Sequence, residues 1–392
     1  MATNPTNELG IATLSLGNWR EHKLEPRLQA AARAGFKVID LFDECWSAYL
    51  AEHNLNGEGA AAWEATPEKL AVARKLCALV KSLGMRIACT QPLRVIEGIL
   101  DPEERRRTLD SVAARFPFMR AFDTDLVFMC ASIRRDAGVA PADLKRVARD
   151  LAELGDMAAA YSGADGGRML KIGYEGLSWA ARNNTWSSSW EVVRFANRPN
   201  VGLVVDAFNV LAVEFADPYN PAEHGRIFPT LQESIKVLAG SMAALVAIVP
   251  GDKIFFFQCG DAERMNPATF IAPTDPDVPA LLPWSRSHRL YPMEQSRGGY
   301  MPVELVAAAV VATGYKGPIS LEVFSHTLNQ AGGNVPDDHA RRGIDSLHAV
   351  VDTIQRLPAF WKGPAELKSA VDCVMQRLEK TESTSGQRTS HI

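Results

Sequence analysis

Short apolar runs alternate with helix-length segments along most of this chain, and this alternation limits its fold more than any other feature. The stretch 169–209 shows one repeat: the runs MLKIGYE and NVGLVVD flank about one helix's worth of residues. This pattern is typical of a βαβ unit. Eight such strand–helix pairs follow one another, which predicts an α/β fold, a (β/α)8 TIM barrel. A doubly wound open sheet is less favoured, because SLGNW after the first strand is not a GxGxxG phosphate turn.

The expected elements have approximate bounds. Strands are expected at 11–16, 37–42, 86–91, 126–131, 169–175, 201–206, 253–258 and 319–324. Helices are expected at 25–34, 67–83, 102–122 (with a kink or break at Pro117), 141–160, 185–197, 229–246, 302–313 and 337–356, with a turn at 162–167.

The chain leaves this pattern near its end, so we divide it into a catalytic barrel, residues 1–361, and a C-terminal extension, residues 362–392. Apolar residues at helical spacing predict an amphipathic helix over 364–380, and the last dozen residues are expected to be disordered. This helix would pack on the outside of the barrel or on a second subunit, which leaves a homo-oligomer open.

Charge and cysteine usage favour a cytoplasmic enzyme that acts on small molecules. The net charge of -4 gives no general attraction to nucleic acid or to an anionic membrane. The start of the chain is polar, and the aliphatic run 305–312 is too short to span a bilayer. The six cysteines form no CxxC pair, as expected of reduced thiols.

Four oxygen-bearing side chains lie at the ends of four consecutive strands of the predicted barrel: Glu175, Asp206, Gln258 and Glu322. The carboxyl ends of barrel strands meet at one face, where barrel enzymes place their chemistry. Three carboxylates and an amide oxygen are a hard ligand set that suits Mg²⁺ or Mn²⁺. For any one residue, capping a helix or pairing with an arginine is the alternative.

Other polar residues near the strand ends are candidates for contacts with substrate. Arginine binds carboxylates with two parallel hydrogen bonds, so the arginines indicate a carboxylate-bearing substrate, with surface salt bridges as the alternative. His288 is a candidate acid or base, or else a solvated loop histidine. One of the acids after the second strand is expected to act as a base or to orient a water molecule. The candidates are Arg94, Ser285, Arg286, Arg289, Asn209, Tyr174, Asp40, Asp43 and Glu44.

Several long motifs resemble those of the fungal-type 3-dehydroshikimate dehydratases, a family of the xylose-isomerase-like barrel superfamily. They are YEGLSWAARNNTWSSSWEVVRFANRPNVGLVVDAFN, FFFQCGDAER, PWSRSHRLYP, RGGYMPVE, ISLEVF and VPDDHARRG. The resemblance covers roughly residues 10–356 in the same order and leaves the extension out.

The resemblance implies metal-dependent loss of water from 3-dehydroshikimate to give protocatechuate, in quinate and shikimate catabolism. It implies Glu175, Asp206, Gln258 and Glu322 as ligands of a divalent metal (Mg²⁺, Mn²⁺ or Co²⁺). It also implies that Ser285, Arg289 and Arg94 contact the substrate. Two departures stand out: Asp40 and Asp43 replace the Glu and His of many relatives, and QCGD replaces the usual QVVD.

Two other functions remain open on sequence grounds. The first is a metal-dependent sugar isomerase or epimerase on the same barrel, which needs no arginine to bind its neutral substrate. The second is a catalytically silent barrel that binds a ligand without turnover, which the altered end of the second strand allows. A nucleic-acid repair endonuclease is disfavoured by the acidic balance and by the scarcity of strand-end histidines.

Overall fold

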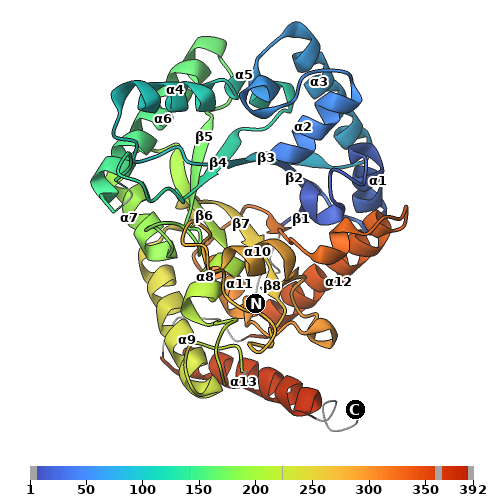
Figure 1. Cartoon of the computed structure of the whole chain (residues 1–392), viewed down its shortest axis with the longest axis vertical. Helices are drawn as coiled ribbons and strands as arrows, with labels where there is room; N and C mark the ends of the chain where they lie inside the picture. Colours follow the sequence, from blue (N-terminus) through green and yellow to red (C-terminus); the bar gives the residue numbers. More distant parts are fainter. Residues whose placement is uncertain (1–6, 141, 223, 358–363, 387–392) are drawn as a thin grey trace.

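A closed barrel of eight parallel strands forms the centre of the molecule (Figure 1). The computed structural model describes residues 7–140, 142–222, 224–357 and 364–386. The strand order around the barrel is β1-β10-β7-β6-β5-β4-β3-β2, which confirms the predicted fold. The strands are β1 (Leu9–Ala12), β2 (Val38–Phe42), β3 (Arg86–Leu93), β4 (Leu126–Cys130), β5 (Lys171–Glu175), β6 (Val201–Asp206), β7 (Ile254–Cys259) and β10 (Ile319–Leu321).

Helices surround the barrel on its outside (Figure 1). The outer helices are α1 (Leu24–Ala34), α3 (Pro67–Ser82), α4 (Pro102–Ala113), α5 (Phe116–Ala121), α6 (Leu144–Asp165), α7 (Trp186–Ala196), α9 (Leu231–Ile248), α11 (Val303–Ala312) and α12 (Val335–Arg356). Shorter elements follow the strand ends: α2 (Asp43–Glu52), α8 (Ala207–Glu214), the hairpin β8 (Asp261–Ala262) and β9 (Arg289–Leu290), α10 (Leu282–Ser287) and the 3-10 turn η5 (His326–Asn329).

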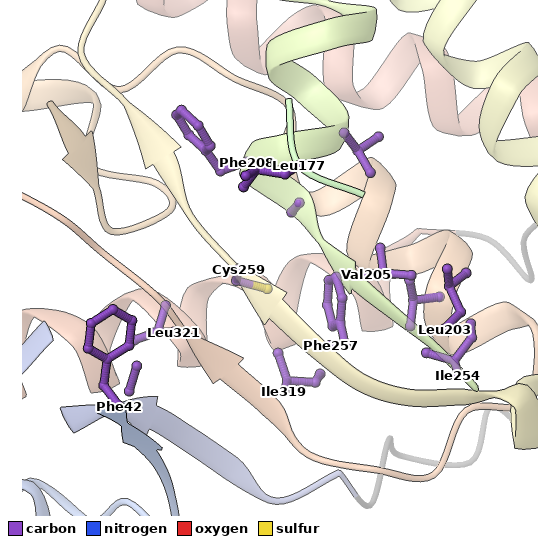
Figure 2. Packing of buried hydrophobic residues seen from close by; sticks show 14 of the residues in the cluster. Phe42, Leu177, Leu203, Val205, Phe208, Ile254, Phe257, Cys259, Ile319 and Leu321 are labelled. Carbon is purple, nitrogen blue, oxygen red and sulfur yellow. The ribbon is translucent and has the colours of Figure 1, made fainter. Parts of the chain in front are cut away.

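Outward-facing residues of the strands form the main core against the helices. Figure 2 shows part of it, with Leu203 and Val205 of β6 beside Ile254 and Phe257 of β7, in agreement with the strand register. All four side chains are buried. Because successive residues of a strand point to opposite faces, the residues between them point into the barrel.

The first strand is shorter than the sequence predicts. It ends at Ala12, and a 3-10 turn, η1 (Thr13–Leu16), replaces its second half. Here hydroxyl side chains bind neighbouring backbone in place of a strand ladder: Ser15 exchanges hydrogen bonds with the backbone of Val323, and Thr13 Oγ1 accepts from the N–H of Phe42. These local side-chain bonds compete with regular strand pairing.

Several helix boundaries also differ from the prediction. The helix expected over 102–122 is divided into α4 and α5, with Pro117 in the first turn of α5, as expected for proline. The turn expected at 162–167 is wrong in its first half, because α6 continues to Asp165 and ends at Gly166, whose φ of 68° suits glycine. The strand ending at 324 stops at Leu321, and α2, α8 and α10 were not predicted.

The C-terminal extension forms the predicted helix, α13 (Pro364–Gly386), which lies against α9 (Figure 1). Residues 381–386, expected to be disordered, belong to this helix. The proposed domain boundary at 361/362 and the rest of the predicted disordered tail, 387–392, lie outside the described residues. Ala370, Val374 and Leu378 are buried, and the Arg377 guanidinium lies 2.6 Å from a carboxylate oxygen of the fully buried Glu304.

One outer helix, α9, is long and apolar enough to meet a simple test for a membrane span, with a mean hydropathy of 1.4 over 18 residues. The sequence analysis did not consider this segment as a span. In the structure α9 lies against α11 and α13 on the outside of the barrel, and its apolar residues contribute to the core. In this window, 39% of the helix is buried inside the structure.

Candidate active site

The structure brings the four predicted metal ligands together at the carboxyl-terminal mouth of the barrel. Glu175, Asp206 and Gln258 are the last or next-to-last residues of β5, β6 and β7, and Glu322 follows β10 directly. These four strands are neighbours in the barrel, and Asp206 is in register with Gln258. We refer to Glu175, Asp206, Gln258 and Glu322 as the carboxylate centre.

An apolar layer inside the barrel lies below the carboxylate centre. It is made of Val38, Ala88, Cys89, Leu126, Phe128, Val204 and Phe256. Asp206 and Gln258 each follow a member of this layer by two residues, so the period of two along a strand turns them inward as well. Gly173 occupies the corresponding position in β5, where a Cβ would lie 2.6 Å from Cβ of Phe128. The inner side of the carboxylate centre therefore rests on an apolar layer.

The carboxylate centre holds more negative charge than its protein partners neutralise. Arg289 is the one guanidinium bonded to it among the described residues: Nη1 lies 2.9 Å from Asp206 Oδ2 and 3.2 Å from Glu322 Oε2. Burial, followed by the nearby Asp206 and Glu322 carboxylates, raises the pKa of Glu175 well above its usual value. Burial raises the pKa of Asp206 to about 6, against the opposing effect of Arg289. Buried like charges of this kind require a cation or a proton.

The amide of Gln258 is oriented for a ligand. Its Nε2 donates to Asp40 Oδ2 over 2.7 Å, across the barrel. Its Oε1 is buried and accepts no hydrogen bond from the described residues. An unsatisfied buried carbonyl beside three carboxylates fits a divalent cation, since hard cations take oxygen ligands. The residues present therefore fit the metal that the sequence predicts.

Residues of other strands bind the proposed ligands by hydrogen bonds: Gln91 from across the barrel and Cys130 from β4, the strand next to β5. Neither residue was predicted from the sequence. Gln91 Nε2 donates to Glu322 Oε1 over 2.9 Å, and the thiol of Cys130 donates to Glu175 Oε2 over 3.1 Å. Gln91 lies in β3 and Cys130 ends β4. Their position near strand ends could have identified Gln91 and Cys130 from the sequence. However, neither a lone glutamine nor a lone cysteine suggests a metal site by itself.

Two residues predicted to bind substrate, Asn209 and Arg289, contact the centre directly, and a third, Ser285, contacts it through Arg289. Asn209 Nδ2 donates to Glu175 Oε1 and Asp206 Oδ2, each over 2.8 Å. Arg289 bridges two of the carboxylates, and its Nη2 donates to Ser285 Oγ over 3.2 Å. Asn209, Ser285 and Arg289 thus connect the centre to the loops around it.

A cavity of about 470 Å³ opens at the barrel mouth, a size that suits a small metabolite. It is lined by Leu14, Asn18, Trp19, Glu44, Arg94, Arg286, Phe324, Ser325, Leu328 and Asn329. Arg94 Nη2 donates to Glu44 Oε1 over 2.9 Å, so the predicted residues Glu44 and Arg94 lie together in its wall.

Arg286 differs from the other two arginines of the mouth. Its guanidinium lies 4.3 Å from the ring centre of Phe324 and 5.3 Å from that of Trp179. No carboxylate among the described residues forms an ion pair with it, and burial lowers its pKa. Arg286 is therefore the guanidinium best placed to receive an anion that enters the cavity.

Other predicted residues are not brought to the centre. Asp43 accepts from Trp63 Nε1 over 2.9 Å and pairs with Arg115. The hydroxyl of Tyr174 donates to Glu97. His288 contacts Glu263, with Nδ1 and Oε2 2.7 Å apart.

Comparison with known proteins agrees with this geometry. A family model described as xylose isomerase-like TIM barrel matches residues 28–350. A 3-dehydroshikimate dehydratase of Neurospora crassa is 31% identical over 362 residues, which are 91% of this chain and 96% of the relative. The chain belongs to the 3-dehydroshikimate dehydratase family of xylose isomerase-like barrels. The family resemblance predicted from its motifs is confirmed.

Two further relatives extend this assignment. A 3-dehydroshikimate dehydratase of Pseudomonas aeruginosa is 33% identical over 321 residues, which are 82% of this chain and 38% of the relative, so the chain spans well under half of that longer protein. A solved fusion of a xylose isomerase-like barrel with 4-hydroxyphenylpyruvate dioxygenase has a TM-score of 0.62 and 28% identity, over 88% of this chain and 42% of the other.

More distant structures share the fold alone. The IOLI protein, solved with a zinc atom, has a TM-score of 0.60 at 17% identity, over 88% of this chain and 98% of the other. A D-psicose 3-epimerase has a TM-score of 0.54 at 14% identity, over 87% of this chain and 97% of the other. Xylose isomerase-like barrels commonly bind divalent metals, but this likeness gives no support to epimerase over dehydratase activity.

Proposed function

We propose that the protein is a hydro-lyase that converts 3-dehydroshikimate to protocatechuate with the help of a divalent metal. The observation that carries this proposal is a hard-ligand centre at the barrel mouth together with Arg286 in the wall of the cavity there. Arg286 has no ion pair among the described residues and feels the charge of Glu322, a member of the centre. A neutral sugar needs no such cation, whereas the substrate of the Neurospora crassa relative carries a carboxylate.

Glu175, Asp206, Gln258 and Glu322 would hold the metal, with Mg²⁺, Mn²⁺ or Co²⁺ as the candidates for an all-oxygen ligand set. When bound, a divalent cation supplies Lewis acidity, which polarises a ketone and stabilises negative charge on its oxygen. Asn209, Gln91 and Cys130 would fix the orientation of these ligands through their hydrogen bonds.

Residues of the cavity wall would position the substrate. Arg286 binds the C1 carboxylate, and the aromatic faces of Phe324 and Trp179, which already flank its guanidinium, exclude water from that ion pair. Arg94 lies in the same wall and adds positive charge. Arg289, predicted to bind substrate, would act mainly on the carboxylates.

The chemical step removes a proton from the carbon beside the ketone and releases the neighbouring hydroxyl as water. The C–H electron pair becomes a new C=C bond, and the C–O pair leaves with the hydroxyl, which takes up a proton to give water. A proton shift from the ring CH2 to the ketone oxygen then makes the ring aromatic, and no oxidant is needed. Of the four predicted acid–base residues, His288, Asp40, Asp43 and Glu44, Glu44 is the one that lines the cavity. We assign proton transfer to Glu44 on this ground.

The direct test uses metal-stripped protein and 3-dehydroshikimate, with Mg²⁺, Mn²⁺ or Co²⁺ added in turn. We expect metal-dependent growth of the ultraviolet absorbance of protocatechuate. Glu191→Gln, a partly exposed control on α7, should keep this activity, whereas Glu175→Gln should lose it. A correctly folded, metal-loaded protein that forms no protocatechuate would refute the proposal and favour a silent binding protein.

The cellular setting follows from the same features. All six cysteines are free and five of them are at least partly buried, which supports the cytoplasm as the compartment. A small carboxylate is the partner we propose. The absence of nucleic-acid and membrane partners, and the oligomeric state, remain predictions.

A further inference from the structure

A second group of metal-binding side chains lies on the rim of the barrel mouth. Glu263, His288 and His326 each offer a ligand atom, and these atoms all lie within 4.8 Å of one another. Glu263 Oε2 lies 2.7 Å from His288 Nδ1, and Glu263 Oε1 lies 3.9 Å from His326 Nδ1. The carboxylate thus lies between the two imidazoles.

Backbone pairing holds these three residues near one another. The N–H of Glu263 donates to the carbonyl of His288 over 2.9 Å, next to the β8–β9 hairpin. His288 forms an antiparallel bridge with Ser325, the residue before His326. The group is therefore built from two loops, one after β7 and one after β10, whose main chains are already joined.

An aromatic wall restricts one side of the group. The ring of Phe270 meets the His288 imidazole edge-on at 5.3 Å and stacks on Tyr219 at 5.2 Å. The His288 and Glu263 side chains are each 24% exposed and that of His326 is 55% exposed. The site is thus open to ions from solvent on one side and walled on the other.

We propose that Glu263, His288 and His326 bind a transition-metal ion of the zinc class at a site separate from the carboxylate centre. Two imidazoles and one carboxylate are a ligand set that zinc uses with a fourth position open to water. The carboxylate centre, by contrast, offers only oxygen and suits harder ions. The rim site would give His288 a role as a ligand in place of a catalytic acid.

A metal at the rim would affect the cavity through the two loops that it joins. His288 is followed by Arg289, which bridges two carboxylates of the centre, and His326 follows Ser325, which lines the cavity. Crosslinking the two loops would restrict both segments. Occupancy of the rim would then tune the entry of substrate.

The test counts metal equivalents. Metal-stripped wild type and the variants His326→Gln and Glu263→Gln are titrated with Zn²⁺ and Co²⁺, with bound metal measured by equilibrium dialysis. His348→Gln, an exposed histidine on α12, is the matched control. We expect His326→Gln and Glu263→Gln to bind one equivalent fewer than wild type and His348→Gln. The visible Co²⁺ spectrum should lose its nitrogen-ligated, four-coordinate bands in the same two variants.

The result is independent of the proposed activity. Glu175→Gln should remove metal from the carboxylate centre and leave the rim equivalent and its Co²⁺ bands in place. Equal binding by wild type, His326→Gln and Glu263→Gln, with folding confirmed by circular dichroism, would overturn the rim site. Absence of protocatechuate formation by metal-loaded wild type that keeps its rim equivalent would count against the dehydratase alone.

Discussion

Both halves of the barrel mouth are built from the ends of parallel strands, but the two halves have different roles. The four proposed metal ligands lie at the ends of β5, β6, β7 and β10, whereas β2, β3 and β4 carry Asp40, Gln91 and Cys130, which bind those residues by hydrogen bonds. One half therefore supplies the donor atoms, and the other fixes their orientation. A strand-end polar residue is thus not by itself evidence for a ligand, because its partner across the barrel decides its role.

The largest effect should follow from removing a donor in the ligand half. Glu175→Gln should lower kcat/KM by at least about 10³-fold, since Lewis acidity contributes several kcal/mol to the barrier. Bound Mg²⁺ or Mn²⁺, measured by dialysis, should fall in parallel while the circular dichroism spectrum stays unchanged. Full activity in this variant would show that the centre is not the metal site.

The second-largest effect should come from Arg289, which connects the carboxylate centre to the loop after β7. Arg289→Met leaves Asp206 and Glu322 without their buried partner, so the metal-free protein should lose about 3–5 kcal/mol of unfolding free energy. Added divalent metal should restore more stability to the variant than to wild type, because it replaces the missing positive charge. Urea denaturation with and without metal measures both, and an unchanged midpoint would contradict the charge argument.

Both halves should contribute to a pH dependence of metal-free stability. Burial, and then the Glu322 carboxylate, raises the pKa of Asp40 from 3.8 to about 8, and burial raises that of Asp206 from 3.8 to about 6. Between about pH 4 and pH 8 the native state thus holds protons that the unfolded chain releases, so stability falls as pH rises. Saturating divalent metal should flatten this slope, because it competes with protons for Asp206 and its positive charge disfavours the protonated form of nearby Asp40. Thermal melts across this range would detect it, and a stability that rises with pH would contradict it.

The supporting half should affect metal affinity more than fold. Asp40→Ala removes the acceptor that orients the Gln258 amide, so the Kd for Mg²⁺ or Mn²⁺ should rise about 10–100-fold. Asp40→Asn keeps a carbonyl oxygen for that hydrogen bond and should stay near wild type. Calorimetric titration of both variants separates the loss of Gln258 orientation from the loss of the Asp40 charge. An equal rise of the metal Kd in the two variants would assign the effect to the lost carboxylate charge.

The smallest effect should come from the cavity wall that both halves share. Arg286→Met should raise KM and lower kcat/KM by at least about tenfold, as for loss of one charged hydrogen bond of ~1.5 kcal/mol. Arg94→Met should cost less, because Arg94 is already paired with Glu44. Steady-state kinetics on 3-dehydroshikimate tests this order, and a larger loss in Arg94→Met would reassign the carboxylate site.

The sequence by itself determined the barrel and placed the proposed ligands at the ends of its strands; their role in binding metal stays a prediction. Alternating apolar runs specify strands through a period of two, and this local period also turns Asp206 and Gln258 inward. The motif resemblance also placed the chain in its family from sequence alone, because each motif is a contiguous stretch of residues. No knowledge of which strands lie opposite one another was needed.

Only the tertiary structure decided which groups support the ligands. Closure of the barrel brings Gln258 to Asp40, 218 residues away, and Glu322 to Gln91, 231 residues away. Pairing across the mouth also separated Asp43, which turns outward to Trp63, from Asp40, which turns inward. These contacts depend on where the closed barrel places strand ends that are far apart in the sequence. Local periodicity carries no information about which of these strand ends meet.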